Sequence, residues 1–343
     1  MSKDRERERS IERIRGRLEA SGFYVSDAHH VRPTAFDLMA RRDSLLLIVK
    51  ILKNIDALDA SEAKRLHELA RLFAARVILV GRNSGSTPLE PGVVYSRYEI
   101  PILVEESLDE YLEKGVPPFL FSSPGGIFAR IDGERLRALR ELHQLSLGAL
   151  ASSAGVSRRT IQLYEEGGGA ETSVVARIER YMGEPIVMPI DFFRTGRARL
   201  RNPLEGPEDD DEAESGPDPE RGRNPARLRT GDPLRDIVLQ QLDGMGWDVV
   251  VTVRCPFDAF SSGSRRGEEE ILLTAVGSLR SAQHRADLLQ QIARVAEGHA
   301  LFIVRGEPNR RSIEGLPILT IPELRRHRDP AELMDDLRER ESA

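Results

Sequence analysis

Residues 146–166 read SLGALASSAGVSRRTIQLYEE, and this stretch predicts two short helices joined by a tight turn. Ser146 and Ser157 stand where the first residue before each helix is expected, and serine oxygens there accept hydrogen bonds from free backbone N–H groups. Gly155 supplies the positive φ that a turn of three or four residues requires. Helix, turn and helix in this order form the arrangement that places the second helix in the major groove of DNA.

The second helix, expected over 158–165, has two different faces. Ile161 and Tyr164 lie three residues apart and should point inward together. The polar side chains suit DNA bases and phosphates, because arginine bonds guanine and phosphate while glutamine bonds adenine. A hairpin of this kind can also be only a packing motif, but the caps, the turn and the polar face together favour DNA binding. The expected DNA contacts are Ser146, Ser157, Arg158, Arg159, Thr160 and Gln162.

This segment resembles the DNA-binding domain of the Cro/C1 repressor family. The matching positions are Leu150-Ala151, Gly155-Val156-Ser157, Ile161 and Tyr164-Glu165. Leu147 departs from the pattern, since the family often has there a glutamine that contacts DNA. The resemblance implies a domain of four to five helices, which we expect over residues 127–193.

Two flanking helices are expected to complete that domain. The first should begin after Asp132 as its N-cap and should bury Ile131, Leu136, Leu139 and Leu142. The second should begin at Ser173 and bury Val174, Val175, Ile178 and Met182.

The composition is that of a soluble globular chain with room for two or three domains. Of the 343 residues, 31% are charged and 40% hydrophobic, and the net charge is −6, so any basic surface must be local. Cys255 is the only cysteine, which excludes an internal disulfide and a thiolate zinc site. The first ten residues are too charged for a secretory signal, and no apolar run has membrane-spanning length. We therefore expect a cytoplasmic protein.

Residues 202–233 form a break in the pattern of apolar residues. They are rich in proline, glycine and acid, so we expect a disordered linker that divides the chain. The acidic block Glu205–Glu220 is interpreted as a solvated spacer, with imitation of nucleic acid as the alternative. Before it, Arg194, Arg197, Arg199 and Arg201 suit either an arm along the DNA backbone or the edge of the linker.

The two sides of the linker look like copies of one α/β unit, copy one over 10–121 and copy two over 234–338. Five segments recur in the same order, which indicates an internal duplication. Both copies predict helix, strand, strand, strand, helix and strand, followed by a further strand and a short helix. The matched segments are 18–25 with 242–249, Phe36-Asp37 with Phe257-Asp258, 45–52 with 271–278, 70–82 with 293–306, and 100–112 with 316–328.

This order resembles the PD-(D/E)xK nuclease fold, most closely the archaeal Holliday-junction-resolvase-like branch, over about residues 10–82 and 234–306. The resemblance implies an Asp and a Glu that hold Mg²⁺ and a Lys that polarises the attacking water. Asp37 fits the Asp and Lys50 fits the Lys, but Ile48 stands at the place of the Glu. A hydrocarbon cannot ligate Mg²⁺, so we expect no metal site and no nuclease activity.

Copy two departs further from the nuclease pattern. Asp258 is present, but the following strand has neither a Lys nor an acid at the corresponding points, and 268–270 (three Glu) are expected in a charged turn. We interpret Asp37 as a strand-end residue that bonds nearby backbone, and Lys50 as a side chain that extends out of the sheet. Both copies are then scaffolds for dimerisation or DNA contact.

The whole layout resembles the HTH-type transcriptional regulators of archaea. We therefore expect a sequence-specific DNA-binding transcriptional regulator of α/β plus all-α class, with double-stranded DNA as its partner and no cofactor. Two alternatives stay open: a metal-dependent, structure-selective nuclease using Asp37 and Lys50, and a protein-binding helix-turn-helix. A homodimer is expected, with the apolar helix 287–296 bringing copy two onto copy one in the same chain or its partner. The sequence names no small-molecule effector.

Overall fold

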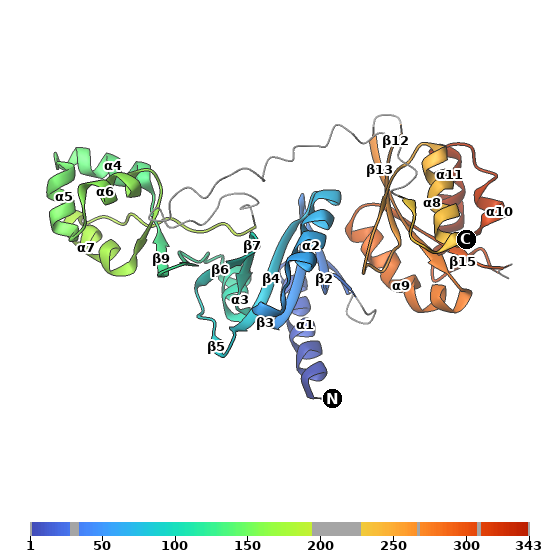
Figure 1. Ribbon diagram of the computed structural model, residues 1–343, viewed down its shortest axis with the longest axis horizontal. Helices are drawn as coiled ribbons and strands as arrows, with labels where there is room; N and C mark the ends of the chain where they lie inside the picture. Colours follow the sequence, from blue (N-terminus) through green and yellow to red (C-terminus); the bar gives the residue numbers. More distant parts are fainter. Residues whose placement is uncertain (1, 28–33, 194–227, 266–267, 307–309, 342–343) are drawn as a thin grey trace. The chain divides into compact units, whose positions relative to one another are not determined.

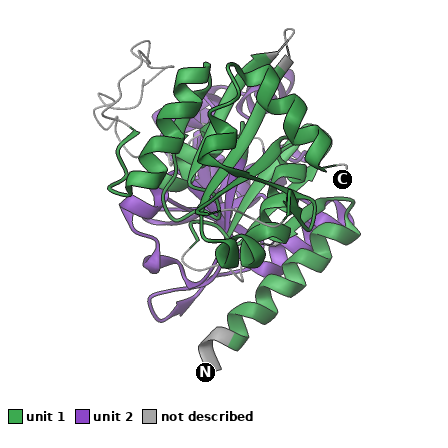
Figure 2. Ribbon diagram, turned by 90° about the vertical axis from the view of Figure 1, so that its right-hand side faces the viewer, with its two compact units in different colours: residues 1–50, 64–75, 216–343 green, residues 51–63, 76–215 purple. Residues whose placement is uncertain are grey.

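The computed structural model describes residues 2–27, 34–193, 228–265, 268–306 and 310–341 (Figure 1). The suggested arginine arm, 194–201, and most of the expected linker, 202–227, lie outside these ranges. Two compact units make up the chain: unit 1 contains residues 1–50, 64–75 and 216–343, and unit 2 contains residues 51–63 and 76–215 (Figure 2). Among the described residues, no helix is long and apolar enough to cross a membrane.

Copy one begins in unit 1 with a helix and three antiparallel strands. They are α1 (Ser2–Ala20), β1 (Tyr24–Asp27), β2 (Leu38–Arg42) and β3 (Leu45–Asn54), paired in the order β1–β2–β3. Ile11, Ile14 and Leu18 follow the helical period and are fully buried, so α1 turns one apolar stripe toward the core. The next helix is α2 (Ala60–Leu72).

Copy two repeats this beginning and completes a six-stranded sheet in the order β11–β12–β13–β14–β16–β15. The β13–β14 and β14–β16 pairs are parallel, whereas β11–β12, β12–β13 and β15–β16 are antiparallel. The elements are α8 (Pro233–Met245), β11 (Asp248–Val251), β12 (Ala259–Arg265), β13 (Glu268–Gly277), α9 (Leu279–Val295), β14 (His299–Val304), β15 (Ser312–Ile313), β16 (Leu316–Thr320), α10 (Ile321–Leu324) and α11 (Pro330–Glu341).

Unit 2 contains the rest of copy one and the helical domain. Its strands follow the order β4–β7–β6–β8–β9–β10, with β5 paired to β4. The elements are β4 (Arg76–Ser84), β5 (Thr87–Pro88), β6 (Val93–Arg97), β7 (Ile100–Leu103), α3 (Glu105–Lys114), β8 (Leu120–Ser123), β9 (Gly126–Arg130), α4 (Gly133–Leu142), α5 (Leu147–Ala154), α6 (Arg158–Glu165), β10 (Gly169–Glu171) and α7 (Thr172–Met182).

The topology supports the internal duplication. The order β1–β2–β3 recurs as β11–β12–β13, and β4–β7–β6 recurs as β14–β16–β15. Ala74 and Glu297, at matching points after α2 and α9, both have positive φ, at 49° and 56°. One detail of the alignment differs. The Asp37 N–H donates to the Val49 carbonyl and the Asp258 N–H to that of Thr274, so β13 aligns one residue away from the sequence match of 45–52 with 271–278.

The two copies contact each other within unit 1. Helix α9 packs on β1 and β2, and the Arg41 guanidinium donates to the Val295 carbonyl at 2.5 Å. The Phe73 ring, just after α2, makes edge-to-face contacts with the rings of Phe257 and Phe260, with centroid distances of 5.9 and 4.9 Å. The apolar helix 287–296 is therefore used inside one chain, which is the first of the two arrangements that the sequence left open.

Two expected boundaries need correction, and the helical domain contains one short strand. Residues 228–233 are not linker: Leu228 is buried against Leu239 and Ala259, and the Asp232 carboxylate caps α8 at Leu234 N. The helical domain also contains the short strand β10, which begins at Gly169. The Phe121 ring lies so close to Gly169 that a Cβ there would meet it at 2.4 Å. Helix α7 starts at Thr172, one residue before the expected start.

Candidate nucleic-acid interface

The helix-turn-helix predicted from residues 146–166 is present as α5, a tight turn and α6. The Ser146 hydroxyl accepts from the Ala149 N–H at 3.1 Å, and the Ser157 hydroxyl accepts from the Thr160 N–H at 3.0 Å. Gly155 has φ 69° and ends α5. Both predicted caps and the predicted turn glycine are confirmed, and Figure 1 shows α4 to α7 grouped around this motif.

One face of α6 is packed into the core of the helical domain. Ile161 is fully buried and Tyr164 is nearly so, as predicted. Burial raises the pKa of the Tyr164 hydroxyl, with a further contribution from Glu171. The Asp132 cap on α4 is also confirmed, with Arg135 N at 3.0 Å. Leu142 is a correction: it lies at the last turn of α4, past the end of the core, and is 75% exposed.

A buried ion pair fixes α6 to α4. The Glu165 carboxylate accepts from Arg140 at both oxygens, with Nη2 to Oε2 at 3.2 Å, and from Arg137 Nε at 3.3 Å. The Glu165 side chain is only 5% exposed. The hydrogen bonds to Glu165 raise the pKa of Arg140, although burial acts in the opposite direction. This role of Glu165 was not predicted. The available signal was two arginines three apart on one helix and an acid at the end of another.

Two further contacts set the relative position of the helices. Gly133 approaches the end of α6 so closely that a Cβ would lie 2.5 Å from the Glu165 carbonyl oxygen. Arg177 of α7 donates from Nε to the Ala154 carbonyl at 2.7 Å, which satisfies a free carbonyl at the end of α5. The backbone entering the turn is therefore held by a neighbouring helix.

The opposite face of α6 is open to solvent. Arg158, Arg159 and Gln162 are exposed, whereas Thr160 is half-buried and its hydroxyl lies 2.8 Å from that of Ser157. The Arg158 guanidinium lies over the first turn of α5, where a Cβ on Gly148 would be 2.8 Å from its Nε. The six expected DNA contacts thus gather at the starts of α5 and α6, with Gln162 one turn further along α6.

The helical domain is nearly neutral as a whole, but two of its arginines are exposed on α6. Residues 130–183 contain eight Arg and seven Asp or Glu. Glu165 is taken up by Arg137 and Arg140, and Glu184 pairs with Arg135 at 2.9 Å. Among the residues that the structure describes, neither Arg158 nor Arg159 forms an ion pair. Their charges are therefore available to an anionic partner.

The nuclease-like position of copy one is filled by a cation of the protein itself. Asp37 is fully buried and forms an ion pair with Arg7 of α1. Lys50 is 4% exposed and its Nζ donates to the Thr34 carbonyl at 3.4 Å. Lys50 is therefore buried rather than extended out of the sheet, and the Asp37 carboxylate pairs with a side chain, which corrects both sequence interpretations.

Copy two has the same arrangement with different residues. Asp258 faces Arg235 of α8 at 3.2 Å and Arg285 of α9 at 3.9 Å, and its Oδ2 accepts from the Val276 N–H at 2.7 Å. Burial lowers the pKa of Arg285, while Asp258 raises it. By the hydrogen bond from Asp258 to Thr274, the positions of Ile48 and Lys50 correspond to Leu273 and Ala275.

The three glutamates 268–270 are not in a turn. They begin β13, and Glu270 lies opposite Gly263, five positions past Asp258 and so roughly 17 Å along the strand. Glu270 instead accepts from Arg338 at 2.7 Å. Within the described ranges, no group of three or more His, Cys, Asp or Glu side chains is placed to hold a metal ion. The residues at Asp37 and Asp258 do not fit the Mg²⁺ site that the fold resemblance implies.

Comparison with known proteins finds two family models in the chain. Residues 7–118 match a PD-(D/E)XK superfamily domain, and residues 136–187 match a helix-turn-helix. Relatives named "Putative HTH-type transcriptional regulatory protein" align over nearly the whole chain. They include proteins from Methanocella arvoryzae (32% identical, 98% of this chain and 97% of the relative), Methanosarcina mazei (33%, 94% and 94%) and Halorubrum lacusprofundi (32%, 97% and 97%). No solved structure matches.

Proposed function

Since this chain belongs to the family of HTH-type transcriptional regulatory proteins found in these archaea, we propose that it regulates transcription by reading duplex DNA with α6 in the major groove. The observation that carries this proposal is that Arg158 and Arg159 are exposed beside Gln162 and form no ion pair with the residues that the structure describes. The other face of the same helix is buried through Ile161 and Tyr164. A rigid helix with free bidentate donors suits base readout. We also propose a cytoplasmic location, since the relatives are named as regulators of transcription and come from archaea.

A helix-turn-helix that binds only protein is the competing function. The exposed α6 face offers two guanidiniums and an amide rather than a buried aromatic or aliphatic anchor, which favours an anionic partner over a protein groove. Arg158→Ala separates the two: binding of a selected duplex should fall and its dependence on salt should become shallower, because a cation that displaces counterions has been removed. Unchanged duplex binding with an unchanged salt slope would favour the protein-binding alternative.

The α/β copies serve in this proposal as a scaffold rather than as nucleases. In each copy the remaining acid is neutralised by an arginine of the copy's first helix, Arg7 on Asp37 and Arg235 on Asp258. A guanidinium supplies the positive charge that a metal would bring, yet it cannot activate water as a Lewis acid. The carboxylates are thereby stabilised as structural groups.

We expect no metal-dependent cleavage of linear or four-way-junction duplexes by the purified chain. One carboxylate per copy and Ile48 in the other position leave Mg²⁺ with too few oxygen ligands. The measurement is an end-labelled cleavage assay with Mg²⁺ and with Mn²⁺. Asp37→Ala purified in parallel is the control for contaminating nucleases, and cleavage by wild type that this variant lacks would contradict the prediction.

We also propose a homodimer on a pseudo-palindromic site. One helix-turn-helix reads a few base pairs, and two half-sites one helical turn apart require two α6 helices related by a two-fold axis. Because α9 already packs on β1 and β2 of the same chain, the contact between chains must use another surface. Light scattering at micromolar concentration, with and without duplex, should give twice 38.4 kDa for the protein component. A strict monomer on an asymmetric site would exclude the dimer.

A further inference from the structure

Copy two contains a pocket whose lining residues do not include Asp258. It opens at the carboxyl ends of β14 and β16, beside the start of α10, and has a volume of about 820 Å³. Pockets of this size enclose small molecules, and in open α/β sheets ligands bind at the carboxyl ends of strands. The helix-turn-helix contributes none of the residues that line it.

The pocket is strongly basic. Five arginines line it, with Glu323 as the one acid among the lining residues: Arg305, Arg310, Arg311, Arg326 and Arg340. Arg305 forms an ion pair with Asp232, with Nη2 and Oδ1 3.0 Å apart, and its side chain remains 60% exposed. Arg310, Arg311 and Arg326 are exposed, and none of the described residues pairs with them. Three free guanidiniums therefore surround one hollow, although the whole chain is acidic.

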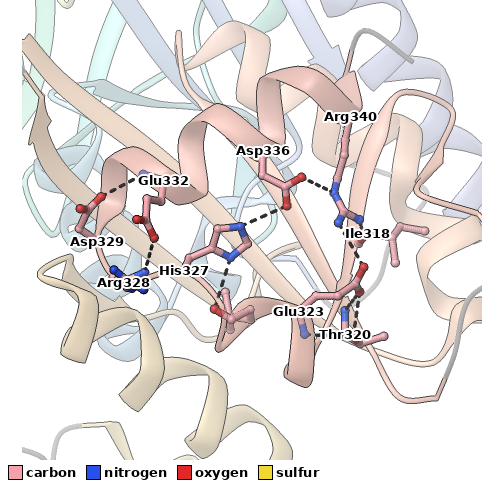
Figure 3. A network of polar contacts seen from close by, with 10 residues as sticks. Ile318, Thr320, Glu323, His327, Arg328, Asp329, Glu332, Asp336 and Arg340 are labelled. Carbon is pink, nitrogen blue, oxygen red and sulfur yellow. Dashed lines mark hydrogen bonds and ion pairs between the residues drawn. The ribbon is translucent and has the colours of Figure 1, made fainter.

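The floor of the pocket is a fixed network of polar contacts (Figure 3). Arg340 of α11 donates to Glu323 at 3.1 Å, to Asp336 at 2.9 Å and to the Ile318 carbonyl at 2.7 Å. Glu323 accepts in turn from the Thr320 N–H and hydroxyl, both at 2.8 Å, in a capping box at the start of α10. His327 extends the network, because its Nε2 lies 3.3 Å from Oδ2 of Asp336. The floor does not have to reorganise when a ligand arrives.

The network also fixes the charge of the floor. Burial alone would raise the pKa of the Glu323 carboxyl, but the hydrogen bonds from Thr320 and Arg340 lower it below its ordinary value. Burial would lower the pKa of Arg340, and the bonds to Asp336 and Glu323 raise it instead. Glu323 and Asp336 therefore compensate the charge of Arg340. Arg310, Arg311 and Arg326 then supply the excess positive charge of the pocket.

Apolar side chains complete the wall. Leu234 of α8, Val304 at the end of β14, and Ile321 and Pro322 of α10 line the same hollow. A ligand that suits these walls has an anionic end for the guanidiniums and a less polar body for the aliphatic side. One guanidinium can donate two parallel hydrogen bonds to the oxygens of one phosphate group, and these charge-assisted bonds are stronger than those between neutral groups.

We propose that this pocket binds a small phosphorylated organic anion. The pocket is concave and lies on copy two, and no residue of α6 lines it. The proposal does not depend on the DNA-binding function, since it rests on the cavity, the three free arginines and the preformed floor of copy two.

Calorimetric titration of the full chain at low ionic strength tests the proposal, with inorganic pyrophosphate and ATP as probes. We expect saturable binding with a dissociation constant below about 1 mM. Arg311→Ala and Arg326→Ala should each weaken it about tenfold or more, because each removes a charge-assisted donor. Arg325→Ala is the matched control: Arg325 is the sequence neighbour of Arg326, is equally exposed and does not line the pocket, so binding should stay unchanged.

Two outcomes would overturn the proposal. The first is no saturable binding of either probe by wild type, or an equal loss in Arg325→Ala. The second is that duplex DNA alone binds in an Arg326-dependent way while neither probe competes, which would assign the arginines to the DNA backbone. Circular dichroism of each variant establishes that the fold is retained, and the wild-type titration decides the question independently of any variant.

Discussion

Arg159→Ala is expected to weaken binding of the chain's best duplex by about tenfold or more, while the helical domain stays folded. Arg159 is exposed at the start of α6 and forms no ion pair with the described residues, so its removal costs the fold little. A specific arginine–guanine pair contributes about 1–3 kcal/mol of discrimination. Fluorescence anisotropy with the selected duplex and with single-base variants measures both the affinity and the position that Arg159 reads.

Arg180→Ala is the control for this experiment. Arg180 is an equally exposed arginine on α7, outside the two helices of the motif, so it tests whether any lost positive charge has the same effect. If Arg159→Ala binds the best duplex as wild type does, or if Arg180→Ala loses as much, then α6 is not the reading helix.

Glu165→Gln is expected to destabilise the helical domain by about 3 kcal/mol, because removal of one member of a buried ion pair leaves its partner uncompensated. The Glu165 side chain is 5% exposed and Arg140, its main partner, is 14% exposed. The neutral amide cannot accept the same charged bonds from Arg140 and Arg137. The position of α6 on α4 should loosen, and duplex binding should fall with it.

Amide hydrogen exchange of α4 and α6 in the full chain is the suitable measurement, since a chain of several units need not unfold in one step. The single tryptophan, Trp247, belongs to copy two and would not report this event. Glu166→Gln is the matched control, because Glu166 is the next residue and is exposed; surface changes of this kind stay within about 0.5 kcal/mol. Equal protection in both variants would show that the ion pair does not hold α6.

The helix-turn-helix could be predicted from the sequence because its signals are local. Serine caps, a turn glycine and apolar residues three apart each act within one or two helical turns. The caps and the glycine are confirmed at Ser146, Ser157 and Gly155, and the apolar pair at Ile161 and Tyr164. Leu142 shows the limit of such patterns: the helical period continues to the end of α4, but the core beneath it stops earlier. The Glu165 ion pair was not predicted, because its partners come from a helix more than twenty residues away and no local pattern joins them to Glu165.

The duplication was visible in the order of elements, but the chemistry at its two acids was not. Arg7 and Arg235 lie far from Asp37 and Asp258 in sequence, and only the packing of α1 and α8 against the strands brings each arginine to its acid. The composition around Leu228 likewise suggested a linker, yet its side chain is buried against Leu239 and Ala259, which are distant in sequence. Lys50 is buried because its strand is covered on the side where solvent was expected.

The central claim, that α6 reads DNA, is tested most directly by selecting bound duplexes from a random library. The selection is performed in parallel with wild type and with the Arg158→Ala, Arg159→Ala double variant. We predict that wild type enriches one motif with two related half-sites and that the double variant enriches none, or a motif changed at the positions facing α6. The same motif from both proteins, or no motif from wild type, would contradict the assignment of α6 as the DNA-reading helix.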